Sequence, residues 1–170
     1  MYKKPEKLKK GDRIGIFLPS SPIKNEFREK GINEIREMGY IPVEVEDVFA
    51  GNGYSAKEPE ETIKDLRSFF SEKDIKALWA ARGGYSANHL LRYMNEIGEV
   101  SPKILIGSSD VSYLLWYFHD RKDMVVFYGP MAFSSIAKQS YDRKNLNMIL
   151  SGNYENIEIP GIILKPGSVK

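Results

Sequence analysis

The residues best suited to chemistry stand at one predicted turn, within the segment Lys103–Phe118 (KILIGSSDVSYLLWYF). An apolar run of strand type stops at Gly107, and Ser108, Ser109 and Asp110 follow at once. Apolar residues then recur at the i, i+3, i+4, i+7 spacing of a helix with one buried face. A sharp strand-to-helix turn with a serine at its corner is the geometry of a nucleophile elbow, beside the positive end of the helix dipole. An oxyanion formed next to Ser109 could accept a hydrogen bond from the backbone N–H of Asp110.

The same residues have a purely structural interpretation. Serine and aspartate are preferred N-cap residues, so Ser108, Ser109 and Asp110 could serve only to begin a helix. Short motifs often match by chance, and on this segment alone the structural interpretation is favoured.

Composition narrows the classes of function. The chain has 170 residues, enough for one domain with a substantial core, and its formal charge of +2 gives no reason to expect nucleic acid as a partner. It has no cysteine, which excludes disulfides, thiolate metal sites and a cysteine nucleophile, and two histidines argue against a polyhistidine metal site. No apolar run reaches the length of a membrane span, and the basic opening segment lacks the apolar region of a signal peptide. We therefore expect a cytoplasmic protein with no metal, membrane or nucleic-acid partner.

Strand and helix patterns alternate along the chain. Each predicted strand is an apolar run, which is typical of a parallel sheet covered on both faces. We predict a doubly wound α/β fold, flavodoxin-like and similar to class I glutamine amidotransferases. Ser55 with Glu58 is predicted to form a capping box. The predicted strands are 13–18, 40–45, 75–80, 104–106 and 124–127, and the predicted helices are 27–38, one after Ser55, 87–97, one after Ser109, and one around 146–150.

The chain divides near residue 150. Residues 1–150 are predicted to form the α/β domain that carries Ser109, and residues 49–54 to form a loop. Residues 151–170 have two Pro-Gly pairs and no helical stripe, so we expect a linker toward a C-terminal domain that these residues do not include. Ligands of doubly wound sheets bind at the carboxyl ends of the strands, where both Gly83-Gly84 and Ser109 are predicted to lie.

Four segments together resemble the LD-carboxypeptidase family of serine peptidases, including its microcin C immunity branch. They are LKKGDRIGI (8–16) followed by PSSP (19–22), IKALWAARGGY (75–85), PKILIGSSD (102–110) and FYGPM (127–131). The run GGYSANHLL and the tyrosine before Gly129-Pro130 look closer to the immunity branch than to the murein-recycling branch. Two positions depart from the family pattern, and both are expected to alter the pocket: Ser108 stands where an aromatic residue is usual, and Ser86 where glycine is common.

The resemblance assigns roles to individual residues. It implies that Ser109 is the nucleophile and that the backbone N–H groups of Asp110 and Gly84 form the oxyanion hole. It also implies that Gly83, Tyr85 and Ser108 contribute to substrate binding. The implied reaction is acyl transfer to Ser109 and then to water, at an amide bond near a free carboxylate, with no cofactor. The implied substrates are murein peptides with an L,D bond or microcin-type peptidyl or aminoacyl nucleotides.

A serine nucleophile needs a base, usually a histidine oriented by a carboxylate, and the resemblance assigns neither to a residue of this chain. In the family, the glutamate and histidine come from a separate C-terminal domain, and members are dimeric. A helix rises about 1.5 Å per residue, so His119 should lie about 15 Å from Ser109. His89 has no support from the resemblance, and we expect a surface position for it. We therefore expect the chain to be inactive by itself, to need that domain in cis or in trans, and to form a homodimer.

Two alternatives from other classes stay open. The chain could be a ligand-binding or dimerisation module that retains the pocket without the chemistry. It could also be a phosphate or nucleotide binder that uses the helix N-terminus after Ser109. The second is disfavoured, because no glycine-rich phosphate loop follows the first predicted strand.

Overall fold

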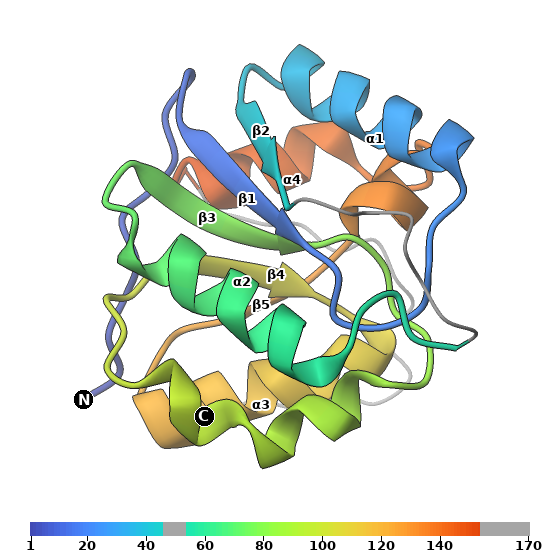
Figure 1. The fold of residues 1–170 in the computed structure, drawn as a ribbon. Helices are drawn as coiled ribbons and strands as arrows, with labels where there is room; N and C mark the ends of the chain where they lie inside the picture. The colour runs from blue at the N-terminus through green and yellow to red at the C-terminus, as the bar shows by residue number, and fades with distance from the viewer. Residues whose placement is uncertain (46–53, 154–170) are drawn as a thin grey trace, which may run out of the picture.

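The computed structural model describes residues 1–45 and 54–153, which form a five-stranded parallel sheet with helices on both faces (Figure 1). The strand order is β2-β1-β3-β4-β5, and every neighbouring pair is parallel. This confirms the predicted doubly wound α/β fold. The strands are β1 (Arg13–Phe17), β2 (Ile41–Glu44), β3 (Ile75–Ala80), β4 (Ile104–Gly107) and β5 (Phe127–Tyr128).

The helices form two layers. In Figure 1, α1 and α4 lie on one face of the sheet, and α2 and α3 lie on the other. Short turns of other helix types complete the layers. The helices are α1 (Asn25–Glu37), α2 (Pro59–Ser71), α3 (Ser112–Lys122) and α4 (Arg143–Leu150), the 3-10 helices η1 (Ala87–Arg92), η2 (Met94–Ile97) and η3 (Ser109–Val111), and the π-helix η4 (Ala132–Ile136). Among the described residues, no helix combines the length and the apolar character needed to cross a bilayer.

Burial explains why the central strands are almost entirely apolar, with Arg13 and Lys76 as half-buried exceptions near the beginnings of β1 and β3. Ile14, Ile16 and Phe17 of β1 have no solvent exposure, and neither has Trp79 of β3. Successive strand residues point to opposite faces, so a strand covered on both faces must be apolar at every position. The one polar atom of Trp79 is satisfied, since its indole N–H donates to the carbonyl of Pro130 at 2.7 Å. That bond holds the segment after β5 against the centre of the sheet.

The predicted capping box at Ser55 and Glu58 is wrong. Helix α2 begins at Pro59, and the capping box is formed by Glu58 and Glu61, with the Glu58 N–H donating to the Glu61 carboxylate at 3.3 Å. Proline favours the first helical position and disfavours helical backbone in the residue before it, so the helix cannot start earlier. The Ser55 hydroxyl instead donates to the Lys57 carbonyl at 2.6 Å.

Two other elements differ from their predicted form. Residues 87–97 form two 3-10 helices rather than one helix of regular period. The last strand covers Phe127–Tyr128 and not 124–127. Its predicted beginning pairs with the N-terminal segment, because the Val125 N–H donates to the Lys3 carbonyl at 3.1 Å and Met124 bridges to Lys3. The backbone of 124–125 is therefore already satisfied outside the sheet.

Most of the predicted linker lies outside the described residues. Helix α4 ends at Leu150, next to the predicted boundary, and only residues 151–153 of the segment 151–170 are described. Most of the predicted loop at 49–54 also lies outside them. The remaining boundaries agree with prediction to within a few residues: α1 begins at Asn25, and α4 begins at Arg143 behind an Asp142 N-cap that accepts from the Asn145 N–H at 2.9 Å.

Candidate active site

The carboxyl ends of β1, β3, β4 and β5 meet at one edge of the sheet. Because β2 and β3 lie on opposite sides of β1, the chain changes direction across the sheet between β1 and β3. Ligands of doubly wound folds bind at such a switch point. The loops that follow β1 (18–22) and β3 (81–86) flank it, and the turn after β4 is adjacent, since β4 pairs with β3. The structure thus brings together the Gly83-Gly84 turn and the Ser109 corner, which were both predicted to lie at the carboxyl ends of strands.

Ser109 occupies the corner between β4 and the helical turn η3 with a backbone φ of +56°. Left-handed backbone is uncommon for a residue other than glycine and is found where the surroundings enforce it, often at active sites. The Ser109 N–H donates to the Tyr128 hydroxyl at 3.3 Å. The side chain is exposed, and its hydroxyl makes no hydrogen bond with any residue that the structure describes. A strained serine that presents an unoccupied hydroxyl at a strand-to-helix corner has the form of a nucleophile elbow.

The Gly83-Gly84 turn lies against this corner. A Cβ atom on Gly83 would stand 3.2 Å from Ser109 Cβ, 3.3 Å from Ser109 Oγ and 3.5 Å from Asp110 N. A Cβ on Gly84 would collide with Ser21 Oγ and come within 2.6 Å of Ser20 Oγ. Gly83 therefore keeps open the space in front of the serine hydroxyl and the Asp110 N–H, while Gly84 permits contact with the loop after β1. Gly84 is one residue, about 3.8 Å, further along the chain.

The carboxylate of Asp110 points toward a neighbouring loop and not along its own helix. Its Oδ2 atom accepts from the Ser20 hydroxyl at 2.6 Å and from the backbone N–H of Ala87 at 2.9 Å. Ala87 is the first residue of η1, so Asp110 caps a different helical turn. The N-cap of η3 is Ser108, and its side chain makes no capping hydrogen bond. The purely structural interpretation of Ser108, Ser109 and Asp110 as caps of their own helix is therefore not supported.

Three further residues at this edge were not assigned to catalysis or substrate binding from the sequence. Tyr128 contacts the Ser109 backbone, Ser20 is bonded to Asp110, and Ser86 donates its N–H to Ser20 Oγ at 3.4 Å. Tyr128 ends β5, Ser20 lies in the loop after β1 and Ser86 lies in the loop after β3, and these positions at the carboxyl ends of strands were the available signal. Of the predicted substrate-binding residues, Tyr85 is highly exposed beside the glycine turn, and Ser108 is half-buried in extended backbone at the elbow.

Neither histidine is bonded to Ser109. The Nδ1 atom of His119 lies 3.1 Å from the Met124 carbonyl, and the ring stacks on Tyr2 with centroids 4.3 Å apart, at the far end of α3. His89 is exposed on η1. Within the described residues, histidine, aspartate and glutamate form no cluster of three or more that could hold a metal ion. The part of the chain that is described thus has a candidate nucleophile with no histidine hydrogen-bonded to it.

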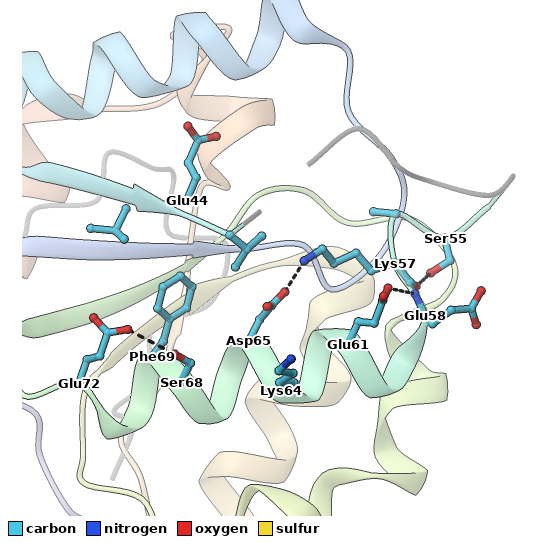
Figure 2. A pocket seen from close by; sticks show the side chains of 13 residues that line it. Glu44, Ser55, Lys57, Glu58, Glu61, Lys64, Asp65, Ser68, Phe69 and Glu72 are labelled. Carbon is cyan, nitrogen blue, oxygen red and sulfur yellow. Dashed lines mark hydrogen bonds and ion pairs between the residues drawn. The ribbon is translucent and has the colours of Figure 1, made fainter. Parts of the chain in front are cut away.

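A separate cavity of about 490 Å³ lies behind the loop at 55–58, between the end of β2 and helix α2 (Figure 2). Its lining includes an ion pair between Lys57 Nζ and Asp65 Oδ2 at 2.7 Å, drawn as a dashed line in Figure 2. Burial raises the pKa of the Asp65 carboxyl, and the Lys57 ammonium acts in the opposite direction. No predicted site residue lines this cavity. Its link to the site is structural, because the Ala56 N–H donates to the Ser20 carbonyl at 2.7 Å.

A serine in left-handed backbone and a glycine turn thus lie together at the carboxyl ends of the strands of a doubly wound α/β domain. Residues 14–129 match the sequence model of the LD-carboxypeptidase N-terminal domain, and the chain belongs to this family. The family predicted from the four segments is confirmed.

Individual relatives fall into two groups. The chain is 33% identical over 122 residues to a murein tetrapeptide carboxypeptidase of Pseudomonas aeruginosa, covering 71% of this chain and 39% of that protein. It is 27% identical over 133 residues to the Microcin C7 self-immunity protein MccF of Escherichia coli, covering 75% and 38%. Among solved structures, an MccF-like protein from Bacillus anthracis superposes with a TM-score of 0.80 at 26% identity, covering 87% of this chain and 47% of that one. The chain thus spans less than half the length of each of these relatives.

Proposed function

We propose that Ser109 is the nucleophile of an amide-bond hydrolysis beside a free carboxylate. The observation that carries this proposal is the positive φ of Ser109, with an exposed hydroxyl next to the open space at Gly83. In the proposed reaction, Ser109 Oγ attacks the acyl carbon and loses its proton to a base. The base passes that proton to the leaving amine, and water then hydrolyses the ester formed on Ser109.

The oxyanion of each tetrahedral intermediate needs donors close to Ser109. The N–H of Asp110 follows the nucleophile directly, and in our proposal the second donor comes from the glycine turn, at Gly84 as the resemblance implies. One such donor is typically worth about 3 kcal/mol in the transition state. The distances from a Gly83 Cβ to Ser109 Oγ and Asp110 N support this arrangement, because a glycine there leaves room for a substrate oxygen.

The base is proposed to come from a C-terminal domain, which supplies the glutamate and histidine of the triad in cis or in trans. Two observations support this: His119 is engaged at the far end of α3, and the relatives are more than twice as long as their matched part. A serine hydroxyl without a base is a weak nucleophile. We therefore expect the 170-residue chain alone to be inactive.

The proposed substrates are of two kinds, murein peptides with an L,D bond and microcin-type peptidyl or aminoacyl nucleotides. One relative is named for murein tetrapeptides, and MccF was solved with aspartyl sulfamoyl adenosine. Both kinds place a scissile amide near a carboxylate. A homodimer and a cytoplasmic location belong to the same proposal.

The test compares the chain with its Ser109→Ala variant on an L,D-tetrapeptide and on a peptidyl nucleotide. Each protein is assayed alone and mixed with a separately produced C-terminal domain of a relative. We expect turnover only in the mixture and only with Ser109. Ser109-dependent turnover by the chain alone would place the base within these residues, with His89 the first to test. Turnover by the Ser109→Ala variant would refute the assignment of Ser109 as the nucleophile.

A non-catalytic binding or dimerisation module is the second candidate. It is favoured by one observation, the engagement of His119 far from Ser109. A serine-directed fluorophosphonate probe separates the two candidates, since labelling of Ser109 in the mixture is expected only for an enzyme.

A further inference from the structure

We propose that the carboxylate of Asp110 and the hydroxyl of Ser20 are positioning residues that set the glycine turn against the Ser109 elbow. The proposal deepens the proposed function and rests on it, because it takes Ser109 as the reacting residue. It assigns to the side chain of Asp110 a role separate from that of its backbone N–H. Neither side chain needs to touch the substrate.

The two side chains join three loops that are remote in sequence. Ser20 follows β1, Ser86 and Ala87 follow β3, and Asp110 follows β4. Asp110 Oδ2 accepts from Ser20 Oγ at 2.6 Å and from the Ala87 N–H at 2.9 Å. Ser20 Oγ in turn accepts from the Ser86 N–H at 3.4 Å. Ser20 is only 1% exposed, so these bonds are shielded from water.

The bridge controls the geometry because it connects both sides of the proposed oxyanion hole. On one side, Asp110 carries the N–H that follows the nucleophile. On the other, Ser86 and Ala87 come directly after the turn that contains Gly83 and Gly84, so their bonds fix where this turn ends. Gly84 also packs on the Ser20 hydroxyl. A shift of the Ser20 loop therefore changes the distance between the glycine turn and the Asp110 N–H.

Loss of the bridge should loosen the turn rather than be absorbed elsewhere. Removing the Ser20 hydroxyl takes one of two donors from Asp110 and leaves the Ser86 N–H, which belongs to a buried residue, without this acceptor. A buried polar group that loses its partner is costly, so the loop would move to regain one. The strained backbone of Ser109 also depends on neighbours that hold it in place.

The absence of cysteine from the chain allows a direct test. A Ser109→Cys variant has a single thiol at the reacting position, and the pH dependence of its alkylation by iodoacetamide gives the thiol pKa. Backbone N–H groups that point at the sulfur stabilise the thiolate and lower this pKa. Adding Ser20→Ala, which changes no charge, is expected to raise the thiol pKa by about half a unit or more.

Ser151→Ala in the same background is the control, since it removes a half-buried hydroxyl that donates to the Met148 carbonyl at 3.2 Å. Ser151 follows α4, whose last residue bonds to Leu8 ahead of β1, so it lies away from the glycine turn and from Asp110. We expect this control to leave the thiol pKa unchanged. Thermal unfolding of each variant is measured in parallel, because a merely structural role lowers the unfolding temperature without moving the pKa. Equal thiol pKa values with Ser20→Ala and Ser151→Ala would overturn the role of Ser20.

Two variants of Asp110 test the carboxylate itself. Asp110→Asn and Asp110→Ala remove the same negative charge, but the amide oxygen of the former can still accept from Ser20 and Ala87. We expect the thiol pKa to be higher in Asp110→Ala than in Asp110→Asn. Equal values would overturn the positioning role. Neither titration needs a base or a substrate, so failure of this bridge is distinguishable from failure of the proposed hydrolysis.

Discussion

The surroundings of Glu34 on α1 and of Ser109 after β4 differ in how completely their polar groups are hydrogen-bonded. At Glu34 on α1, a carboxylate that is only 4% exposed accepts hydrogen bonds from Tyr141, from Gln139 at 3.2 Å and from Arg143 at 2.5 Å. At Ser109, the side chain is exposed, the backbone is strained, and the hydroxyl has no hydrogen-bond partner among the described residues. A cluster whose bonds are all made resists change, whereas an unoccupied hydroxyl is available to react.

The electrostatics of the Glu34 cluster follow from its contacts. Burial would raise the pKa of the Glu34 carboxyl, but hydrogen bonds from Tyr141, Arg143 and Gln139 outweigh it and lower the pKa below its usual value. Burial and the same contact with Glu34 raise the pKa of the Tyr141 phenol. The cluster therefore ties α1 to the segment before α4 by charge-assisted bonds, which are about twice as strong as neutral ones.

The largest expected effect is the loss of turnover on removal of the Ser109 hydroxyl. In the chain mixed with a C-terminal domain, Ser109→Ala is expected to lower turnover by about 10⁶-fold, as removal of a catalytic serine does in a well-studied serine protease. His119→Ala is the control, since this ring is engaged at the other end of α3. Steady-state turnover and unfolding temperature are measured for both. A comparable loss of turnover with His119→Ala would assign the reaction to His119 as well and contradict its structural role at the end of α3.

The open space at Gly83 provides the next largest effect. Gly83→Ala places a methyl group 3.3 Å from Ser109 Oγ and 3.5 Å from Asp110 N, where the substrate oxygen is proposed to bind. We expect kcat/KM to fall about 10²-fold, near the effect of losing one oxyanion donor. Gly129→Ala is the matched control, because its Cβ would meet only Ile106 Cγ2, at 3.4 Å. Equal effects of the two substitutions would argue against an oxyanion site at Gly83.

The Glu34 cluster should affect stability and its dependence on pH. Its carboxyl has a folded-state pKa below the unfolded value of about 4.5, so its contribution is complete above that pH and is lost as pH falls through the folded value. Glu34→Gln is expected to lower the free energy of unfolding by about 2 kcal/mol at pH 7 and by less at pH 3. Denaturant unfolding at both pH values measures this.

Glu37→Gln is the control for that measurement. Glu37 also pairs with Arg143, at 3.1 Å, but its side chain is 63% exposed. An exposed ion pair contributes about 0.5 kcal/mol or less, so the unfolding free energy should barely change. A loss at Glu37 as large as that at Glu34 would mean that burial does not distinguish the two carboxylates.

The smallest expected effect is the release of strain at Ser109. Glycine adopts positive φ without steric cost, so Ser109→Gly should be about 0.5–1 kcal/mol more stable than Ser109→Ala, which lacks the hydroxyl but keeps the strain. Thermal and denaturant unfolding of both variants measure the difference. If Ser109→Ala proved as stable as Ser109→Gly, the elbow would not be strained.

Much of this fold could be predicted from the sequence. Strands β1, β3 and β4 are apolar except at Arg13 and Lys76, near their beginnings, because both faces of the sheet are covered. A strand buried on both faces has the same pattern wherever it lies. The strand that stops at Gly107 and the helical spacing after it also locate Ser109 at a corner. The rise of a helix, about 1.5 Å per residue, likewise predicts that His119 lies far from Ser109. These features depend on neighbours in sequence, so local patterns reveal them.

Competing interactions explain two predictions that were wrong, the start of α2 and the start of β5. Helix α2 begins at Pro59 and not after Ser55. Met124 pairs with Lys3 and is therefore not part of β5. In the first case the restriction that proline imposes on the preceding residue outweighed the serine cap. In the second case, the backbone of residues 124–125 pairs with Lys3 in the N-terminal segment, which is remote in sequence.

Only the tertiary structure decided which loops meet around Ser109. The carboxylate of Asp110 bonds to Ser20, which lies 90 residues earlier, and Gly83, not Gly84, faces the hydroxyl of Ser109. Both facts follow from the strand order, which sets β3 between β1 and β4, and from the direction in which each loop leaves its strand. Strand order is selected by packing across the whole sheet, and no single segment of the sequence contains that information.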